Sequence, residues 1–161
     1  MVNYIDIKLT NISDAVDKVG YYDISLDSDG DLSKVSGFDT NIIMSMFSER
    51  RASSSEVVDP LLRRGWWGNT LSDSPGFEDG SKLWLLEQAR LTSGTISLAQ
   101  QYTLDGLRWL KDDGYVYDVQ VDVQPSYSSV SGSGVAITVN LVRKDNTVEY
   151  KYYSIWELTG R

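Results

Sequence analysis

A chain of 161 residues, 41% of them hydrophobic and 24% charged, is long enough for one soluble domain with a core. It has no cysteine and no histidine, which excludes disulfide frameworks, thiolate or histidine metal sites, and Ser-His-Asp or Cys-His catalysis. The formal net charge of -8 argues against general nucleic-acid binding, and no stretch reaches the roughly 18 apolar residues of a membrane span.

The N-terminal part is predicted to be an arm followed by a hairpin. Residues 1–20 form the arm, and they begin without the basic and apolar regions of a signal peptide, which favours residence in a cytosol. Residues 22–26 and 32–35 have the character of two short strands, joined by the Asp-rich turn 27–31. This turn does not fit a calcium loop, because Gly30 is fourth from Asp27 and an EF-hand needs glycine sixth.

A helix is predicted over about residues 41–50, capped by Asp39 or Thr40. Four apolar side chains are expected on the face that packs against a sheet: Ile42, Ile43, Met46 and Phe47. The helix ends in an acid and two arginines, namely Glu49, Arg50 and Arg51. Cations near a helix C-terminus interact favourably with the helix dipole, so these arginines have a structural explanation as well as a binding one.

A long loop follows, from about residue 53 to residue 80. It holds two of the three prolines and four glycines and shows no clear periodicity, and loops of this length are usually functional or disordered. Its apolar side chains argue against disorder; they are Leu61, Leu62, Trp66, Trp67 and Phe77. We therefore expect the loop to pack on its own domain or on a partner.

Two neighbouring helices and a sheet are predicted for the remainder. Ser81 caps the first helix, and the second runs from about Thr95 or Ile96 to Asp112. Alternating patterns predict strands over residues 115–123, 135–141 and 149–155. The predicted fold class is α+β: a single domain over residues 1–161 with an N-terminal hairpin, three helices and a C-terminal antiparallel three-stranded sheet.

The concentration of arginine and tryptophan around the long loop predicts a docking surface. Four of the eight arginines and two adjacent tryptophans lie there, and these residue types dominate protein–protein hot spots. The predicted partner-binding residues are Glu49, Arg50, Arg51, Arg63, Arg64, Trp66 and Trp67. No metal, cofactor or catalytic residue is predicted.

Glycoside hydrolysis is the enzyme alternative, because it needs only two carboxylates about 5 to 10 Å apart, one of them with a raised pKa. The candidates are Glu49, Glu56, Glu78 and Glu87, and no spacing singles out a pair. Glu49 lies beside two arginines, which favours its ionised form and is wrong for a general acid. The scaffold interpretation is therefore preferred.

Three segments carry a resemblance to a known family. They are Arg-Gly-Trp-Trp-Gly at residues 64–68, Ser-Lys-Leu-Trp at residues 81–84, and Leu-Arg-Trp-Leu-Lys-Asp-Asp-Gly at residues 107–114, ahead of the paired strands. From about Tyr21 to the last strand, the chain resembles the Mu-like phage baseplate protein forty-six family. That family is distantly similar to the T-even baseplate wedge protein twenty-five and to protein W of P2-like phages.

The resemblance implies a structural subunit of a contractile tail baseplate, located in the virion and assembled in the cytoplasm of the bacterial host. Its implied position is in the wedge near the tube, in multiple copies of a symmetric assembly. The implied partners are other wedge proteins, the tail sheath and tube-proximal proteins, and the implied fold is that of the sheath handshake domain. The Glu-Pro-Arg motif of the T-even relatives has its nearest match in Glu49-Arg50-Arg51, where Arg50 stands in place of proline.

Two questions stay open at the level of sequence. The Tyr- and Val-rich terminal strands present either an edge for strand addition from another chain or an internal sheet with no free edge. An assembly adaptor or chaperone would share the acidic surface and the docking loop of a structural subunit. A muralytic enzyme is the weaker alternative.

Overall fold

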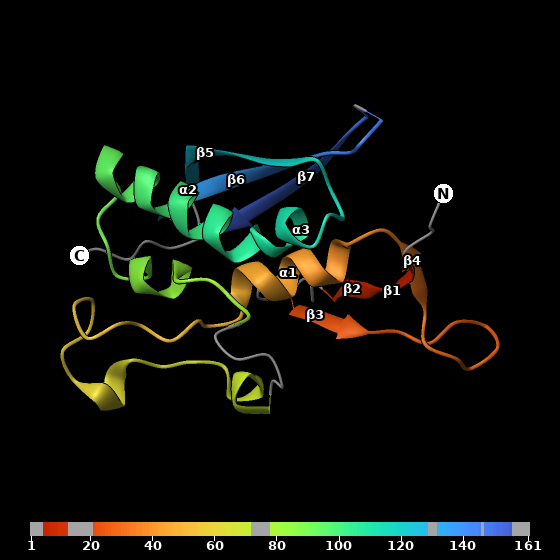
Figure 1. Ribbon diagram of the computed structural model, residues 1–161, viewed down its shortest axis with the longest axis horizontal. Coiled ribbons are helices and arrows are strands. Elements are labelled where there is room, and N and C mark those ends of the chain that lie inside the picture. Colours follow the sequence, from red (N-terminus) through yellow and green to blue (C-terminus); the bar gives the residue numbers. More distant parts are fainter. Residues whose placement is uncertain (1–4, 13–20, 72–77, 129–131, 146, 156–161) are drawn as a thin grey trace. The chain divides into compact units, whose positions relative to one another are not determined.

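The structure is a computed structural model that describes residues 5–12, 21–71, 78–128, 132–145 and 147–155. The chain divides into two compact units, Met1–Met44 and Ser45–Arg161. Figure 1 shows the order of the elements in each unit. Within the described residues, no helix combines the length and apolar character that crossing a bilayer requires.

The first unit contains two small antiparallel ladders. Strand β1 (Ile5–Ile7) pairs with β4 (Lys34–Ser36), and β2 (Leu9–Ile12) pairs with β3 (Tyr21–Ile24). The expected turn at residues 27–31 is present, because the Asp27 carboxylate accepts hydrogen bonds from the main-chain amides of Asp29 and Asp31, at 3.0 Å each. Thus β3 and β4 flank the predicted turn, but β3 pairs with β2 and β4 pairs with β1. Both of these partner strands lie in the segment predicted as an arm.

Helix α1 (Asp39–Phe47) crosses the boundary between the units and ends earlier than predicted. Ile42 and Met46 are buried as expected, whereas Phe47 is 45% exposed, so its assignment to the buried face was wrong. The helix ends at Phe47 because the next residues turn into extended backbone: the amide of Arg50 donates to the carbonyl of Ser81, and the amide of Ser81 donates to the carbonyl of Ser48, both at 2.9 Å.

The second unit is built around the antiparallel sheet β5–β6–β7, with β5 over Asp118–Ser128, β6 over Gly132–Val142 and β7 over Val148–Ile155. The three predicted strands are confirmed with different bounds: the first begins three residues later and ends five residues later than predicted, the second is longer at both ends, and the third begins one residue earlier. The register pairs Val121 with Val139 and Val123 with Ile137, so the alternating apolar residues gather on one face. That face forms the core with side chains of the helices, among them Leu107 and Leu110.

The helices of this unit differ from the prediction in number and type. The helix expected after Ser81 is only the 3-10 helix η3 (Leu83–Leu86). The second expected helix begins earlier, at a Thr92 cap, and divides into α2 (Ser93–Leu107) and α3 (Trp109–Asp112). Helix α2 packs on β5, where the Gln100 side chain donates to the carbonyl of Val121 at 2.8 Å (Figure 1).

Two glycines, Gly80 and Gly106, allow close packing of the backbone segments that form the site described below. A Cβ atom at Gly106 of α2 would stand 2.9 Å from the carbonyl oxygen of Ser45 and 3.1 Å from Cβ of Ser81. Gly80 has a positive φ of 100°, and its Cβ would stand 2.4 Å from the carbonyl oxygen of Ser48. Only residues without a side chain allow the backbones to approach this closely.

Helix α2 offers a matched test of this close approach. We expect Gly106→Ala to lower the free energy of unfolding by about 1–3 kcal/mol, because the methyl group meets backbone that cannot move freely. Gly94→Ala, in the same helix, has only Thr92 Oγ1 nearby at 3.7 Å. It should leave stability unchanged or raise it by up to about 1 kcal/mol through helix propensity. Urea denaturation of both variants checks this, and equal effects would contradict the close-packing explanation.

Candidate docking site

An extended backbone segment, residues 49–52, organises the site. On one side the amide of Arg50 donates to the carbonyl of Ser81, as described above. On the other side the amide of Trp66 donates to the carbonyl of Glu49 at 2.7 Å, and the amide of Ala52 donates to the carbonyl of Arg63 at 3.0 Å. This segment, called the hub below, therefore brings two stretches of predicted site residues, 49–51 and 63–66, side by side.

Arg64 joins the hub to the residues after η3. Its Nη1 atom lies 2.7 Å from Oε1 of Glu49 and 3.2 Å from Oε2 of Glu87. Its guanidinium carbon lies 4.8 Å from the ring centre of Trp84, whose indole nitrogen donates to the carbonyl of Arg50 at 2.9 Å. Hydrogen bonds to Glu87 and then Glu49 raise the pKa of Arg64. Its backbone φ of 45° is unusual for a residue with a side chain, and it fits a position held by several contacts at once.

Arg51 and Arg63 bind main-chain carbonyls of the long loop. Arg51 donates to the carbonyls of Arg64 at 3.0 Å and Pro60 at 3.3 Å. Arg63 donates to the carbonyls of Val57 at 2.8 Å and Val58 at 3.0 Å. A loop without regular secondary structure leaves many carbonyls without backbone partners, and the two guanidinium groups supply the missing donors. The described part of the loop is thus held in one shape by its own arginines.

The two tryptophans take different positions. Trp66 is partly buried and lies against Gly68, where a Cβ would stand 2.4 Å from the indole ring. Trp67 begins the 3-10 helix η2 (Trp67–Leu71) and is 70% exposed. The two ring centres are 5.9 Å apart. Trp66 therefore belongs to the loop's own packing, whereas Trp67 is displayed to solvent.

Trp67 is one of five large apolar side chains that the described loop exposes. The five are spread along the loop from residue 58 to residue 71 and are together called the apolar loop face below: Val58, Leu61, Leu62, Trp67 and Leu71. Leu61 is 91% exposed. Val58 and Leu71 were not predicted, and only the apolar content of the loop could have pointed to them. Leu61 and Leu62 lie in the 3-10 helix η1 (Pro60–Leu62), which Asp59 caps by accepting from the amide of Leu61 at 2.9 Å.

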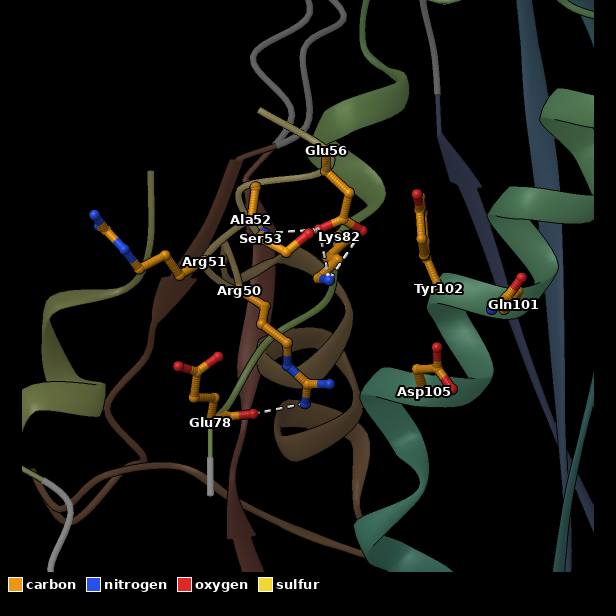
Figure 2. Close-up of a pocket in the computed structure, with 10 residues that line it drawn as sticks. All are labelled: Arg50, Arg51, Ala52, Ser53, Glu56, Glu78, Lys82, Gln101, Tyr102 and Asp105. Atoms are coloured by element: carbon orange, nitrogen blue, oxygen red, sulfur yellow. Dashed lines mark hydrogen bonds and ion pairs between the residues drawn. The ribbon is translucent and has the colours of Figure 1, made fainter. Parts of the chain in front are cut away.

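A cavity of about 460 Å³ opens on the other side of the hub, between Arg50 and helix α2 (Figure 2). At one end Lys82 contacts both carboxylate oxygens of Glu56, at 2.9 and 2.8 Å, and Ser53 donates to Glu56 through its amide and its hydroxyl. At the other end Arg50 donates to the carbonyl of Glu78 at 2.6 Å. Sequence reasoning missed the Glu56–Lys82 pair, because partners 26 residues apart in a loop leave no local pattern.

Three of the four carboxylates considered for glycoside hydrolysis form ion pairs here. Glu49 and Glu87 share Arg64, and Glu56 pairs with Lys82. Partial burial acts to raise the pKa of Glu56, but the hydrogen bonds from Lys82 and Ser53 outweigh it and lower this pKa to about 2. A general acid needs the opposite shift.

Comparison with known proteins gives consistent matches over this region. Residues 38–148 match the family described as Phage protein GP46. The baseplate protein gp46 of Escherichia phage Mu is 33% identical over 102 residues, which cover 62% of this chain and 68% of the relative. The Mu-like prophage FluMu protein gp46 of Haemophilus influenzae is 33% identical over 118 residues, covering 73% and 77%. The residues that match the family include the hub, the loop and the cavity.

The tryptophan pair yields a stability prediction. We expect Trp67→Ala to change the free energy of unfolding by less than about 0.5 kcal/mol, because its side chain is mostly in water. Trp66→Ala should cost about 1–3 kcal/mol, since it removes packing against Gly68 and leaves a void. Thermal melting of the two variants compares adjacent residues of the same type. A large loss of stability in Trp67→Ala would show that this residue is core.

The Glu56–Lys82 pair yields a pH prediction. The pKa of Glu56 is lower in the folded chain than its ordinary value of 4.5. The pair therefore stabilises the fold above about pH 4.5, and this contribution is lost as the pH falls toward 2. We expect about 1–2 kcal/mol, because both side chains are about a quarter exposed and solvent screens them. In urea denaturation at pH 7, 4 and 2.5, Glu56→Gln should lose less stability on acidification than the wild type. An equal loss in both proteins would contradict this prediction.

Proposed function

The chain belongs to the phage protein GP46 family, and on this basis we propose that it is a structural subunit of a contractile phage tail baseplate. It sits in the wedge, in several copies of a symmetric assembly, and links the wedge core to the first sheath layer near the tube. The names of the two relatives support the baseplate part of this proposal. The finer position in the wedge rests on the resemblance and on the surfaces described next.

The apolar loop face is the observation that carries the docking role. Its five side chains are exposed on a segment that Arg51, Arg63 and Arg64 hold by side-chain hydrogen bonds. An ordered segment that displays leucine and tryptophan loses little conformational entropy on binding, and large exposed apolar groups mark interaction sites. The loop face is the surface that contacts the wedge core. The arginines predicted to touch the partner act mainly by shaping this loop.

The outer edge of β7 supports the proposed contact with the sheath. The sheet order places β5 and β7 at its two edges. The edge at β5 is occupied in its middle by Gln100, which binds the carbonyl of Val121. Among the described strands none pairs with the outer side of β7. An extended segment of a sheath subunit would add there as a further strand, through main-chain hydrogen bonds.

Purified tail particles provide the test of this proposal. Mass spectrometry should find the wild-type chain in the particles. Leu61→Asp and Trp67→Ser should lower its incorporation at least about tenfold, because they place a charge or remove the indole at the loop face. Leu26→Asp is the matched control, since Leu26 is 65% exposed but lies outside the loop. All three variants should melt like the wild type.

The outcomes separate the alternatives. Normal incorporation of folded Leu61→Asp and Trp67→Ser would remove the docking role of the loop. A wild-type chain found only free in the lysate would instead identify an assembly factor. Because the chain lacks cysteine, a single cysteine at position 61 or 148 gives a specific crosslinking site. Crosslinks from position 61 to a wedge protein and from position 148 to the sheath would establish both proposed contacts.

A further inference from the structure

Two adjoining cavities form a cleft between the hub and the helices α2 and α3. The cavity of about 460 Å³ shares Arg50, Glu78 and Asp105 with a second cavity of about 280 Å³. In Figure 2, Arg50 and Glu78 come from one wall, and Gln101, Tyr102 and Asp105 come from α2 on the opposite wall. The second cavity continues along α3 to Asp112 and Asp113.

Arg50 differs from the other arginines of the site in its unused donors. The guanidinium groups of Arg51, Arg63 and Arg64 are each bound to two acceptors at least, within the loop or beside it. Arg50 donates through Nη2 to the carbonyl of Glu78, and the described residues offer no acceptor to its Nη1. Because Arg50 lines both cavities, its guanidinium has donor capacity left for an acceptor in the cleft.

Asp105 presents the complementary group on the opposite wall. It is exposed on α2, and the described residues offer its carboxylate neither a hydrogen bond nor an ion pair. Glu56 and Lys82 neutralise each other, whereas Glu78 adds a further carboxylate on the wall of Arg50. A cation that can only donate therefore lies across the cleft from a carboxylate that can only accept.

This pairing selects the chemistry of the occupant. An acidic side chain would suit Arg50 but would be repelled by Asp105 and Glu78. A basic side chain would suit Asp105 but would be repelled by Arg50 and would bring it no acceptor. A peptide group carries a carbonyl and an N–H on opposite sides, so it satisfies both walls without bringing a charge into the cleft.

We propose that the cleft binds an extended segment of a neighbouring baseplate protein, with a main-chain carbonyl accepting from Arg50 and a main-chain N–H donating to Asp105. The inference rests on the proposed function, because it names a second contact made by the same baseplate subunit. From Gln101 to Asp112 the helical wall rises about 16 Å, which is the length of about five residues of extended chain. The contact is distinct from the apolar loop face, because none of the five residues of that face lines either cavity.

Photo-crosslinking in purified particles tests this contact. Benzoylphenylalanine replaces Gln101, which is exposed and lines the cleft, or Gln88, a matched exposed glutamine outside the cleft. From position 101, ultraviolet light should capture one stretch of about five residues of a single baseplate neighbour, identified by mass spectrometry. Position 88 should not capture that stretch.

Two substitutions test the hydrogen bond that each wall of the cleft is proposed to make. Arg50→Met and Asp105→Asn should each lower the crosslink yield from position 101 at least about tenfold, since each removes one charge-assisted hydrogen bond. Asp122→Asn, an exposed aspartate on β5, should leave the yield unchanged. Asp105→Asn changes one atom on an exposed helix surface, so its melting temperature should equal that of the wild type even if Arg50→Met is less stable.

Each contrary result has a defined meaning. A loss in Asp105→Asn alone would indicate a basic side chain in the cleft, and a loss in Arg50→Met alone would indicate an acidic one; both overturn the peptide contact. A yield that neither substitution changes, or no captured neighbour at position 101, also overturns it while the baseplate role stands. If the wild-type chain is absent from the particles, the proposed function fails and this contact fails with it.

Discussion

The extended hub of residues 49–52 is the constraint on which the rest of the site depends. It is hydrogen-bonded on one side to Ser81 and on the other to residues 63 and 66, so it fixes three stretches of chain that are far apart in sequence. Gly80 and Gly106 make this arrangement possible: Gly80 lets its segment approach the backbone of Ser48, and Gly106 lets Ser45 and Ser81 approach α2. The apolar loop face lies within residues 58–71, whereas the cleft is lined by the hub, by loop residues 53, 56 and 78, and by α2. Any shift of the hub would therefore move both surfaces together.

Local patterns predicted the regular elements of the second unit well. The strands were found because alternation at a period of two persists over β5, β6 and β7. The α-helix expected after Ser81 is replaced by a 3-10 helix, because the amides of Leu85 and Glu87 donate to carbonyls three residues earlier and not four. The pairing of β1 and β2 with later strands was missed as well, since three- and four-residue strands carry little signal and their partners are non-local.

For the site, the sequence predicted which residues gather but not what they do. Arg51, Arg63 and Arg64 bind carbonyls or carboxylates of their own chain, and their contact with a partner stays a prediction. Their roles depend on loop geometry, such as the positive φ of Arg64, which residue types do not reveal. The same geometry decides that Trp66 packs and Trp67 is exposed, although the two are adjacent and identical. Contacts between Glu56 and Lys82 are equally non-local.

The two surfaces beside the hub have complementary physical properties. The apolar loop face can supply binding free energy when its side chains are buried by a partner, but this free energy depends little on the partner's orientation. The cleft offers directional hydrogen bonds, which contribute less net free energy but are lost when the partner is misplaced. In a symmetric assembly, each subunit must be both retained and oriented. A rigid hub that carries one surface of each kind meets both requirements within a segment of about sixty residues, from the end of α1 to α3.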